Sequence, residues 1–251
     1  SCERVFRPDL HGKPVVVLKA GSSTIGSELT VSHTGSLSGS VELYEALFQR
    51  VGIISVTNPS QLLETLKLLC VIGAPNGKRV AGFTCSGGGA TMLADHAEKI
   101  DLIFPAIDSI KEPKLSALLP DIATVSNPLD YTTPIWGQAE MTYPVFAKAI
   151  SAIEADTAVL VQDYPAAEID SSKVYYRADA IAFAQATKEK GLPAIICATL
   201  PENMDLETRQ LLIAKGVAPM QGIHEALNSI QVSANWKQSH SRILSEKSEY
   251  L

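Results

Sequence analysis

The chain has 251 residues, of which 46% are hydrophobic and 19% charged, so it has the composition of a folded protein with a core and not that of a disordered one. Twenty-one basic and 27 acidic side chains leave a net charge of −6, which argues against a nucleic-acid-binding protein because such proteins carry a basic surplus. No apolar run reaches the roughly 18 residues of a membrane-spanning helix, and no signal-peptide pattern is visible at the start. The four cysteines stand far apart in the sequence. We therefore expect a cytoplasmic protein with reduced cysteines.

The first part of the chain predicts an incomplete sheet. Apolar runs at 13–19 and 53–56 read as buried strands, and a loop over residues 21–40 follows the first of them. Helices are expected near 41–50 and after Pro59, which suits an early helical position. Two strands do not form a stable parallel sheet alone. Residues 1–75 are therefore predicted to be the C-terminal part of a domain whose earlier strands lie outside this sequence.

From residue 78 onward the pattern alternates strand with helix. The two longer central runs are apolar throughout rather than alternating, which is typical of buried parallel strands. The expected strands are 79–84, 102–104, 157–161, 193–197 and 217–220, and the expected helices are 86–99, 138–153, 172–190, 204–215 and 222–231. This order predicts an α/β fold with a flavodoxin-like parallel sheet.

The domain boundaries follow from the same pattern. Ala74 to Gly77 contains Pro, Asn and Gly, which interrupt regular structure, so the boundary is placed there. A complete flavodoxin-like domain is expected over residues 78–232. Residues 233–251 are polar and are expected to form a trailing linker or helix.

The loop at 21–40 contains the first candidate catalytic residue, His33. A neutral imidazole is a nucleophile near pH 7, and small Gly, Ser and Thr residues around it would let the loop move. Long loops inside compact domains are usually functional or mobile. The alternative is an exposed loop with an incidental histidine.

A glycine-rich turn is the second candidate site. Ser86, Gly87, Gly88 and Gly89 follow a predicted strand and open a predicted helix, so backbone N–H groups and the positive end of the helix dipole could bind a phosphate. The alternative is a serine N-cap with a tight turn.

A third segment, from Asn127 to Asp130, is expected either to line a cleft at the carboxyl edge of the sheet or to form a rigid turn.

Several other motifs fail. Met92 replaces the last glycine of a dinucleotide fingerprint, and Thr84 replaces the first glycine of a nucleophile elbow around Ser86, which disfavours a serine hydrolase. Cys85 at a helix start could have a lowered thiol pKa, but we expect a buried structural thiol. The histidines show no ligand spacing, and we expect no metal site.

These motifs together resemble a known family, the NDP-forming acyl-CoA synthetases, which include ADP-forming acetate–CoA ligases and are relatives of succinyl-CoA synthetase. Residues 13–21 followed by 32–39, with the sequence Ser-His-Thr-Gly-Ser-Leu-Ser-Gly, look like the histidine loop of that family. The Ser-Gly-Gly-Gly turn at 86–89, Asn-Pro-Leu-Asp at 127–130 and the closing strand and helix at 216–227 are also similar. The resemblance covers roughly residues 12–232.

The resemblance implies an acid–thiol ligase in which His33 is phosphorylated. An acyl phosphate formed from acyl-CoA and phosphate would pass its phosphoryl group to the imidazole, and the loop would carry it to NDP. One helix N-terminus in each of two flavodoxin-like domains would face the phosphohistidine, the second being the turn at 86–89. Ser32, Thr34 and Gly35 would contribute to phosphate binding.

The family also implies partners and substrates. A CoA-binding Rossmann domain and an ATP-grasp domain, in the same polypeptide or another subunit, would complete the enzyme, so this chain alone is expected to be incomplete, inactive and part of an oligomer. CoA, ATP or ADP, phosphate and a small carboxylic acid would be substrates, no cofactor would be tightly bound, and Mg²⁺ would accompany the nucleotide on the ATP-grasp domain. The alternative from another class is a catalytically inert flavodoxin-like regulatory or scaffolding module.

Overall fold

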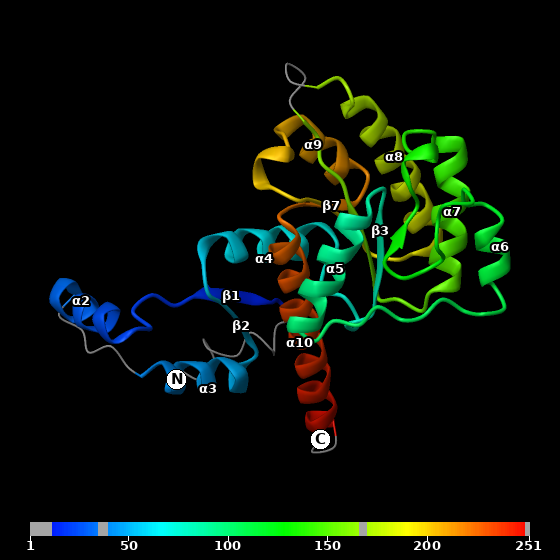
Figure 1. Ribbon diagram of the computed structural model, residues 1–251. Helices are drawn as coiled ribbons and strands as arrows, with labels where there is room; N and C mark the ends of the chain where they lie inside the picture. The colour runs from blue at the N-terminus through cyan, green and yellow to red at the C-terminus, as the bar shows by residue number, and fades with distance from the viewer. Residues whose placement is uncertain (1–11, 35–39, 166–169, 249–251) are drawn as a thin grey trace.

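A computed structural model describes residues 12–34, 40–165 and 170–248, with the side chains of residues 31, 33, 34 and 243–248 not described. The described elements form two sheets, each of parallel strands, and the helices around them (Figure 1). The strands are β1 (Val15–Leu18), β2 (Ile53–Val56), β3 (Val80–Thr84), β4 (Leu129–Asp130), β5 (Thr157–Val161), β6 (Ala194–Ala198) and β7 (Val217–Gln221). The helices are α2 (Thr24–Thr34), α3 (Val41–Val51), α4 (Pro59–Val71), α5 (Gly87–Lys99), α6 (Glu112–Ser116), α7 (Ala139–Ala152), α8 (Lys173–Lys190), α9 (Leu206–Ala214) and α10 (Ile223–Ser248), with short 3-10 turns at Thr133–Ile135 and Pro201–Asn203.

The larger sheet has five parallel strands in the order β4-β3-β5-β6-β7. Numbered along the chain, this is the order 2-1-3-4-5 of the flavodoxin-like fold, which confirms the predicted fold class. Strands β3, β5 and β6 are buried at every position, as their unbroken apolar runs predict.

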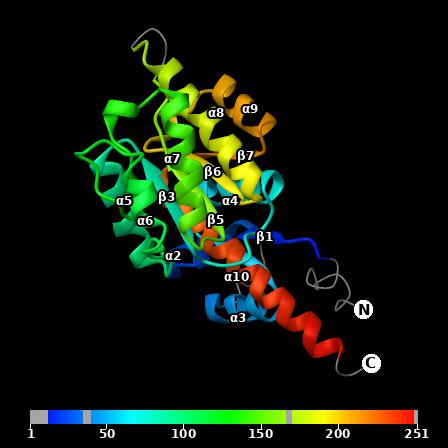
Figure 2. The same ribbon diagram turned by 90° about the vertical axis from the view of Figure 1, so that its right-hand side faces the viewer.

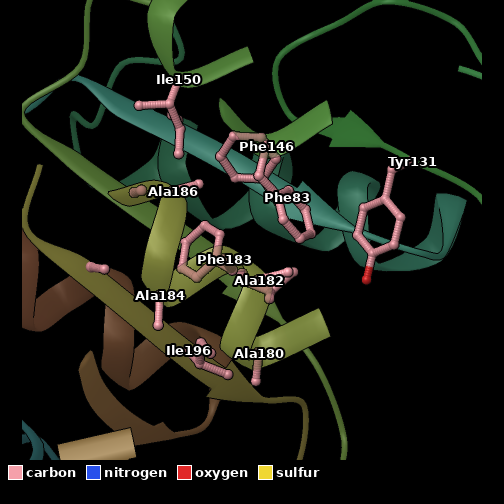
Figure 3. Close-up of a cluster of buried hydrophobic side chains, with 14 of the residues drawn as sticks. Phe83, Tyr131, Phe146, Ile150, Ala180, Ala182, Phe183, Ala184, Ala186 and Ile196 are labelled. Atoms are coloured by element: carbon pink, nitrogen blue, oxygen red, sulfur yellow. The ribbon is translucent and has the colours of Figure 1, made fainter. Parts of the chain in front are cut away.

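Helices cover both faces of this sheet. On one face α7 and α8 lie side by side, and a core of aromatic and alanine side chains fills the space between these helices and the strands (Figure 2; Figure 3). Phe83 of β3 is fully buried there, with Phe146 and Phe183 rings 5.5 and 5.6 Å away in edge-on arrangements. On the other face the core is formed with α4, α5 and α10.

The smaller sheet consists of β1 and β2, paired in parallel with Val15 opposite Ile53. Trp236 of α10 packs on this sheet with Ile54 and Val56, and α3 and α4 contact it as well. The sheet is therefore stabilised by helices that come from distant parts of the sequence, since two strands alone bury too little.

The prediction of a loop over residues 21–40 is wrong for Thr24–Thr34, because these residues form the helix α2. Hydroxyl side chains satisfy backbone groups locally in this helix: Ser23 Oγ accepts from Gly26 N–H (3.1 Å), and Thr30 Oγ1 donates to Gly26 O (2.9 Å). None of the α2 side chains that the structure describes is buried.

The predicted strand at 102–104 is also wrong. Ile103 forms only an isolated bridge with Arg79, and Pro105, which has no N–H to donate, follows immediately after residue 104. The strand beside β3 is instead β4, where Phe83 is opposite Leu129.

At the end of the described chain, the helix predicted at 222–231 and the trailing segment form one helix, α10. Its second half is not a linker, because Trp236 packs on the smaller sheet and Lys237 Nζ donates to Ala74 O (3.0 Å). Helix α4 contacts β1, β7 and α10, so it lies between the two sheets although it precedes the expected boundary at 74–77. The division into domains stays a prediction.

Candidate phosphate site at the start of helix α5

The start of α5 is an exposed polar turn at the carboxyl edge of the larger sheet. Strand β3 ends at Thr84, and Ser86 is the N-cap residue with extended backbone angles. Thr84 Oγ1 accepts from Ser86 N–H (3.2 Å), which fixes the turn, whereas the Ser86 side chain makes no capping hydrogen bond to α5. The first N–H groups of the helix are thus not capped by this serine and face an exposed surface.

The three glycines at this helix start have different environments. A Cβ added at Gly89 would lie 2.5 Å from Thr84 Oγ1, so packing against β3 requires glycine there. Gly87 and Gly88 are exposed, and a Cβ on either would meet its nearest atom at 3.6 Å, an ordinary contact. Alanine is the better helix former by roughly 1 kcal/mol, so the protein's own packing gives no reason for glycine at 87 and 88. Glycine at both positions leaves the backbone open to close approach by an external group.

Asp130 lies beside this helix start. Its Oδ2 is the atom 3.6 Å from the Cβ position built on Gly87, and its Oδ1 accepts from Thr132 N–H (2.9 Å). The positive end of α5 stabilises a carboxylate here, and the same carboxylate limits where a second anion can bind.

Asn127 is not open to a ligand in the same way. Its Oδ1 accepts from Gly82 N–H, and its Nδ2 donates to the carbonyls of Val80 and Pro105, each at 2.9 Å. The amide braces the residues before β4 against β3, which fits the rigid turn that was the alternative prediction.

The histidine-bearing segment lies elsewhere. His33 is in the last turn of α2, and Figure 1 shows α2 well apart from α5, at the outer end of the smaller sheet. Ser32 is exposed and its hydroxyl donates to Leu29 O (2.8 Å). The side chains of His33 and Thr34, and Gly35 as a whole, lie outside the described residues. The structure therefore does not bring the two candidate segments together in this conformation.

Cys85 precedes the helix start and is partly buried. Burial, together with the negative charge of Asp179, raises the pKa of its thiol to about 11, so the thiol is protonated at neutral pH. This agrees with the prediction of a structural cysteine.

Two histidines that are distant in sequence meet near β7. The rings of His96 and His224 are 5.4 Å apart and line a cavity of about 280 Å³ with Thr199 and Gln221. No group of three His, Cys, Asp or Glu side chains among the described residues could hold a metal ion, and no described helix is long and apolar enough to cross a membrane.

A buried polar cluster behind the site was not predicted. Tyr131, which directly follows β4, and Gln162, which directly follows β5, are both buried, and the Tyr131 hydroxyl donates to Asp179 of α8 (2.9 Å). The available signal was helical periodicity, because Asp179 is four residues before Phe183 and falls on the apolar face of α8.

Comparisons with known proteins address the family. The "Succinyl-CoA ligase like flavodoxin domain" family matches residues 5–69. The chain is 36% identical over 126 residues to acetate–CoA ligase [ADP-forming] II subunit alpha of Pyrococcus furiosus, covering 50% of this chain and 27% of that protein. It is 30% identical over 233 residues to acetate–CoA ligase [ADP-forming] I of Archaeoglobus fulgidus, covering 91% of this chain and 31% of that protein. The resemblance to the NDP-forming acyl-CoA synthetases is confirmed.

A solved structure of similar fold extends over nearly the whole chain. Acetyl-coenzyme A synthetase 1 of Ca. Korarchaeum cryptofilum, in complex with phosphate and ADP, matches 93% of this chain and 49% of its own with a TM-score of 0.76 and 21% identity. At that identity the match shows the fold. The chain spans about a third or less of the two curated NDP-forming acyl-CoA synthetases described above, so it corresponds to one segment of these larger proteins.

Proposed function

We propose that this chain forms the histidine-bearing and phosphate-binding part of an NDP-forming acyl-CoA synthetase. The observation that carries the proposal is the start of α5, which lacks a serine cap and where the exposed glycines at 87 and 88 leave room that packing does not require. A helix N-terminus of this kind binds a phosphate through backbone donors and the helix dipole.

The proposed chemistry has three balanced steps. Phosphate attacks the thioester carbon of acyl-CoA, and the C–S bond breaks to give acyl phosphate and CoA. The imidazole of His33 attacks phosphorus, the P–O bond to the acyl group breaks, and the carboxylic acid leaves. NDP then takes the phosphoryl group from the phosphohistidine to give NTP and free imidazole.

Under this proposal His33 moves between sites. Helix α2 lies apart from α5, and none of the described α2 side chains is buried. Movement of α2 would therefore break no core packing by these side chains. The proposal places CoA binding on a Rossmann domain and nucleotide binding, with its Mg²⁺, on an ATP-grasp domain, both outside this sequence. The Pyrococcus furiosus relative, which is named as an alpha subunit, is consistent with an enzyme divided among several parts.

The test is phosphorylation of the full-length protein with radiolabelled ATP. We expect an acid-labile label that is lost in His33→Ala and retained in the matched control His224→Ala, a histidine that is exposed on α10. Label that persists on His33→Ala contradicts the relay. A wild-type protein that takes no label, and turns over no ATP with CoA and acetate, supports the inert flavodoxin-like module instead.

A further inference from the structure

A buried carboxylate on α8 is the starting point. Asp179 is fully buried and accepts hydrogen bonds from Tyr131 Oη (2.9 Å), Thr142 Oγ1 (3.0 Å) and Gly137 N–H (3.1 Å). None of these partners is a cation, and burial raises the pKa of Asp179. Burying a carboxylate in this way costs more than burying an apolar side chain of the same size. Its presence therefore calls for a role in fixing a particular arrangement.

All three donors belong to one stretch of chain. Tyr131 follows β4 directly, Gly137 comes just before α7, and Thr142 is in the first turn of α7. Asp179 thus holds both ends of the segment 131–137. Gly137 has a φ of +76°, and a Cβ there would lie 2.6 Å from Tyr175, so the segment is also closely packed at its far end.

The network continues across the carboxyl ends of the strands. Gln162 Nε2 donates to Tyr131 Oη (3.2 Å), and Tyr164 Oη donates to Gln162 Oε1 (2.9 Å). Tyr131, Gln162 and Tyr164 are all buried, and the Tyr131 ring lies in the aromatic cluster with its hydroxyl pointing away from Phe146 (Figure 3). Each polar group named has a partner, which makes the arrangement specific.

The segment that Asp179 fixes forms one side of the candidate phosphate site. Tyr131 N–H donates to Thr84 O (2.9 Å), which joins the start of the segment to the end of β3. Asp130, the residue before it, is the carboxylate beside Gly87. A shift of Tyr131 would move Asp130 relative to the first turn of α5.

We propose that Asp179 is a positioning residue that holds the segment 131–137, and with it Asp130, against the first turn of α5 and so sets the geometry of the phosphate site. The inference rests on the proposed function, because it assigns Asp179 to one of the two phosphorylation routes of His33. Acyl-CoA and phosphate react at the start of α5, whereas ATP reacts on the ATP-grasp domain.

The test compares these two routes in the full-length protein. Asp179→Asn keeps the side-chain size but places an amide N–H₂ group against one of the three donors. We expect labelling of His33 from radiolabelled phosphate plus acetyl-CoA to fall roughly tenfold to a hundredfold, with a raised KM for phosphate, as for a small misplacement of reacting groups. Labelling from radiolabelled ATP should stay unchanged.

Glu189→Gln is the matched control. Glu189 is on the same helix, and its carboxylate accepts from Tyr143 Oη of α7 (2.6 Å), but this pair is exposed and near the other end of α8. Both labelling routes should be unaffected. If Asp179→Asn does not fold, Tyr131→Phe removes one donor with the ring retained, and the same route should be slowed.

Each outcome decides the matter. Equal loss by both routes, or no loss by either, overturns the positioning role of Asp179 while the phosphohistidine relay stands. Absence of label from both donors in the wild-type protein refutes the relay itself, and the positioning role falls with it.

Discussion

Replacing the glycines at the start of α5 one at a time separates a packing role from a binding role. Gly88→Ala adds a methyl group whose nearest neighbour is Ser86 Oγ at 3.6 Å. Alanine is favoured over glycine in a helix by about 0.5–1 kcal/mol, so the free energy of unfolding should be unchanged or raised by that amount. Gly89→Ala places its methyl group 2.5 Å from Thr84 Oγ1, on a side chain that is 2% exposed. Overpacking of this kind costs about 1–3 kcal/mol.

Gly88→Ala, which should not destabilise the fold, should instead impair the use of phosphate. In the full-length protein, the methyl group of Gly88→Ala would stand where the phosphate approaches, and we expect the KM for phosphate to rise about tenfold, equivalent to roughly 1.4 kcal/mol. Urea unfolding of the same variant provides the stability value. A Gly88→Ala protein that uses phosphate as well as the wild type would refute the reasoning, and so would a Gly89→Ala protein of unchanged stability.

Three further predictions concern charge, reactivity and bracing. Arg79 lowers the pKa of Asp156 through side-chain and backbone hydrogen bonds. Asp156→Asn should therefore lower the free energy of unfolding at pH 7 by about 1 kcal/mol, a small value because the Arg79 side chain is 39% exposed to solvent. A carboxylate with a lowered native pKa contributes its full stability above the unfolded value of about 3.9, and this contribution is lost as pH falls through the native value. The difference between wild type and variant in urea unfolding should therefore shrink as pH falls below about 3.9. With a pKa of about 11, Cys85 should resist iodoacetamide at pH 8 while exposed Cys70 reacts; rapid modification of Cys85 in peptide mass spectra would contradict its burial. Asn127→Ala leaves backbone groups of β3 and its neighbours without partners and should cost about 2–4 kcal/mol in urea unfolding, with a loss under about 0.5 kcal/mol counting against the brace.

The strands could be predicted because their signal is local. Uniform apolar runs such as Thr157–Val161 have one stable use in a soluble α/β protein, as buried parallel strands. β4 was missed because only Leu129 and Asp130 pair, too few residues for a pattern to form, whereas the run at 102–104 has the right composition but only a single bridge. Edge pairing is decided by tertiary contacts.

The candidate site was predictable in part for the same reason. The glycines at 87–89 indicate a helix start in the sequence. Only the structure shows that packing requires glycine at position 89 and not at position 88. α2 was missed because Ser, Thr and Gly favour turns in general, while here the hydroxyl groups bond to the backbone of the helix. The contacts of Asp179 join residues 37 to 48 positions apart, and no local pattern contains them.

The sharing of α4 and α10 by the two sheets limits how a phosphoryl group could be carried. Because both helices contact both sheets, bending between the sheets would break the cores they share, so the proposed relay has to work by movement of the segment that contains His33. His33 stands 41 − 33 = 8 residues before Val41, where α3 begins. At about 3.4 Å per extended residue, the chain between His33 and Val41 spans at most about 27 Å. For the phosphoryl carrier proposed above, this length limits how far His33 can travel from the start of α3, apart from the length of its own side chain.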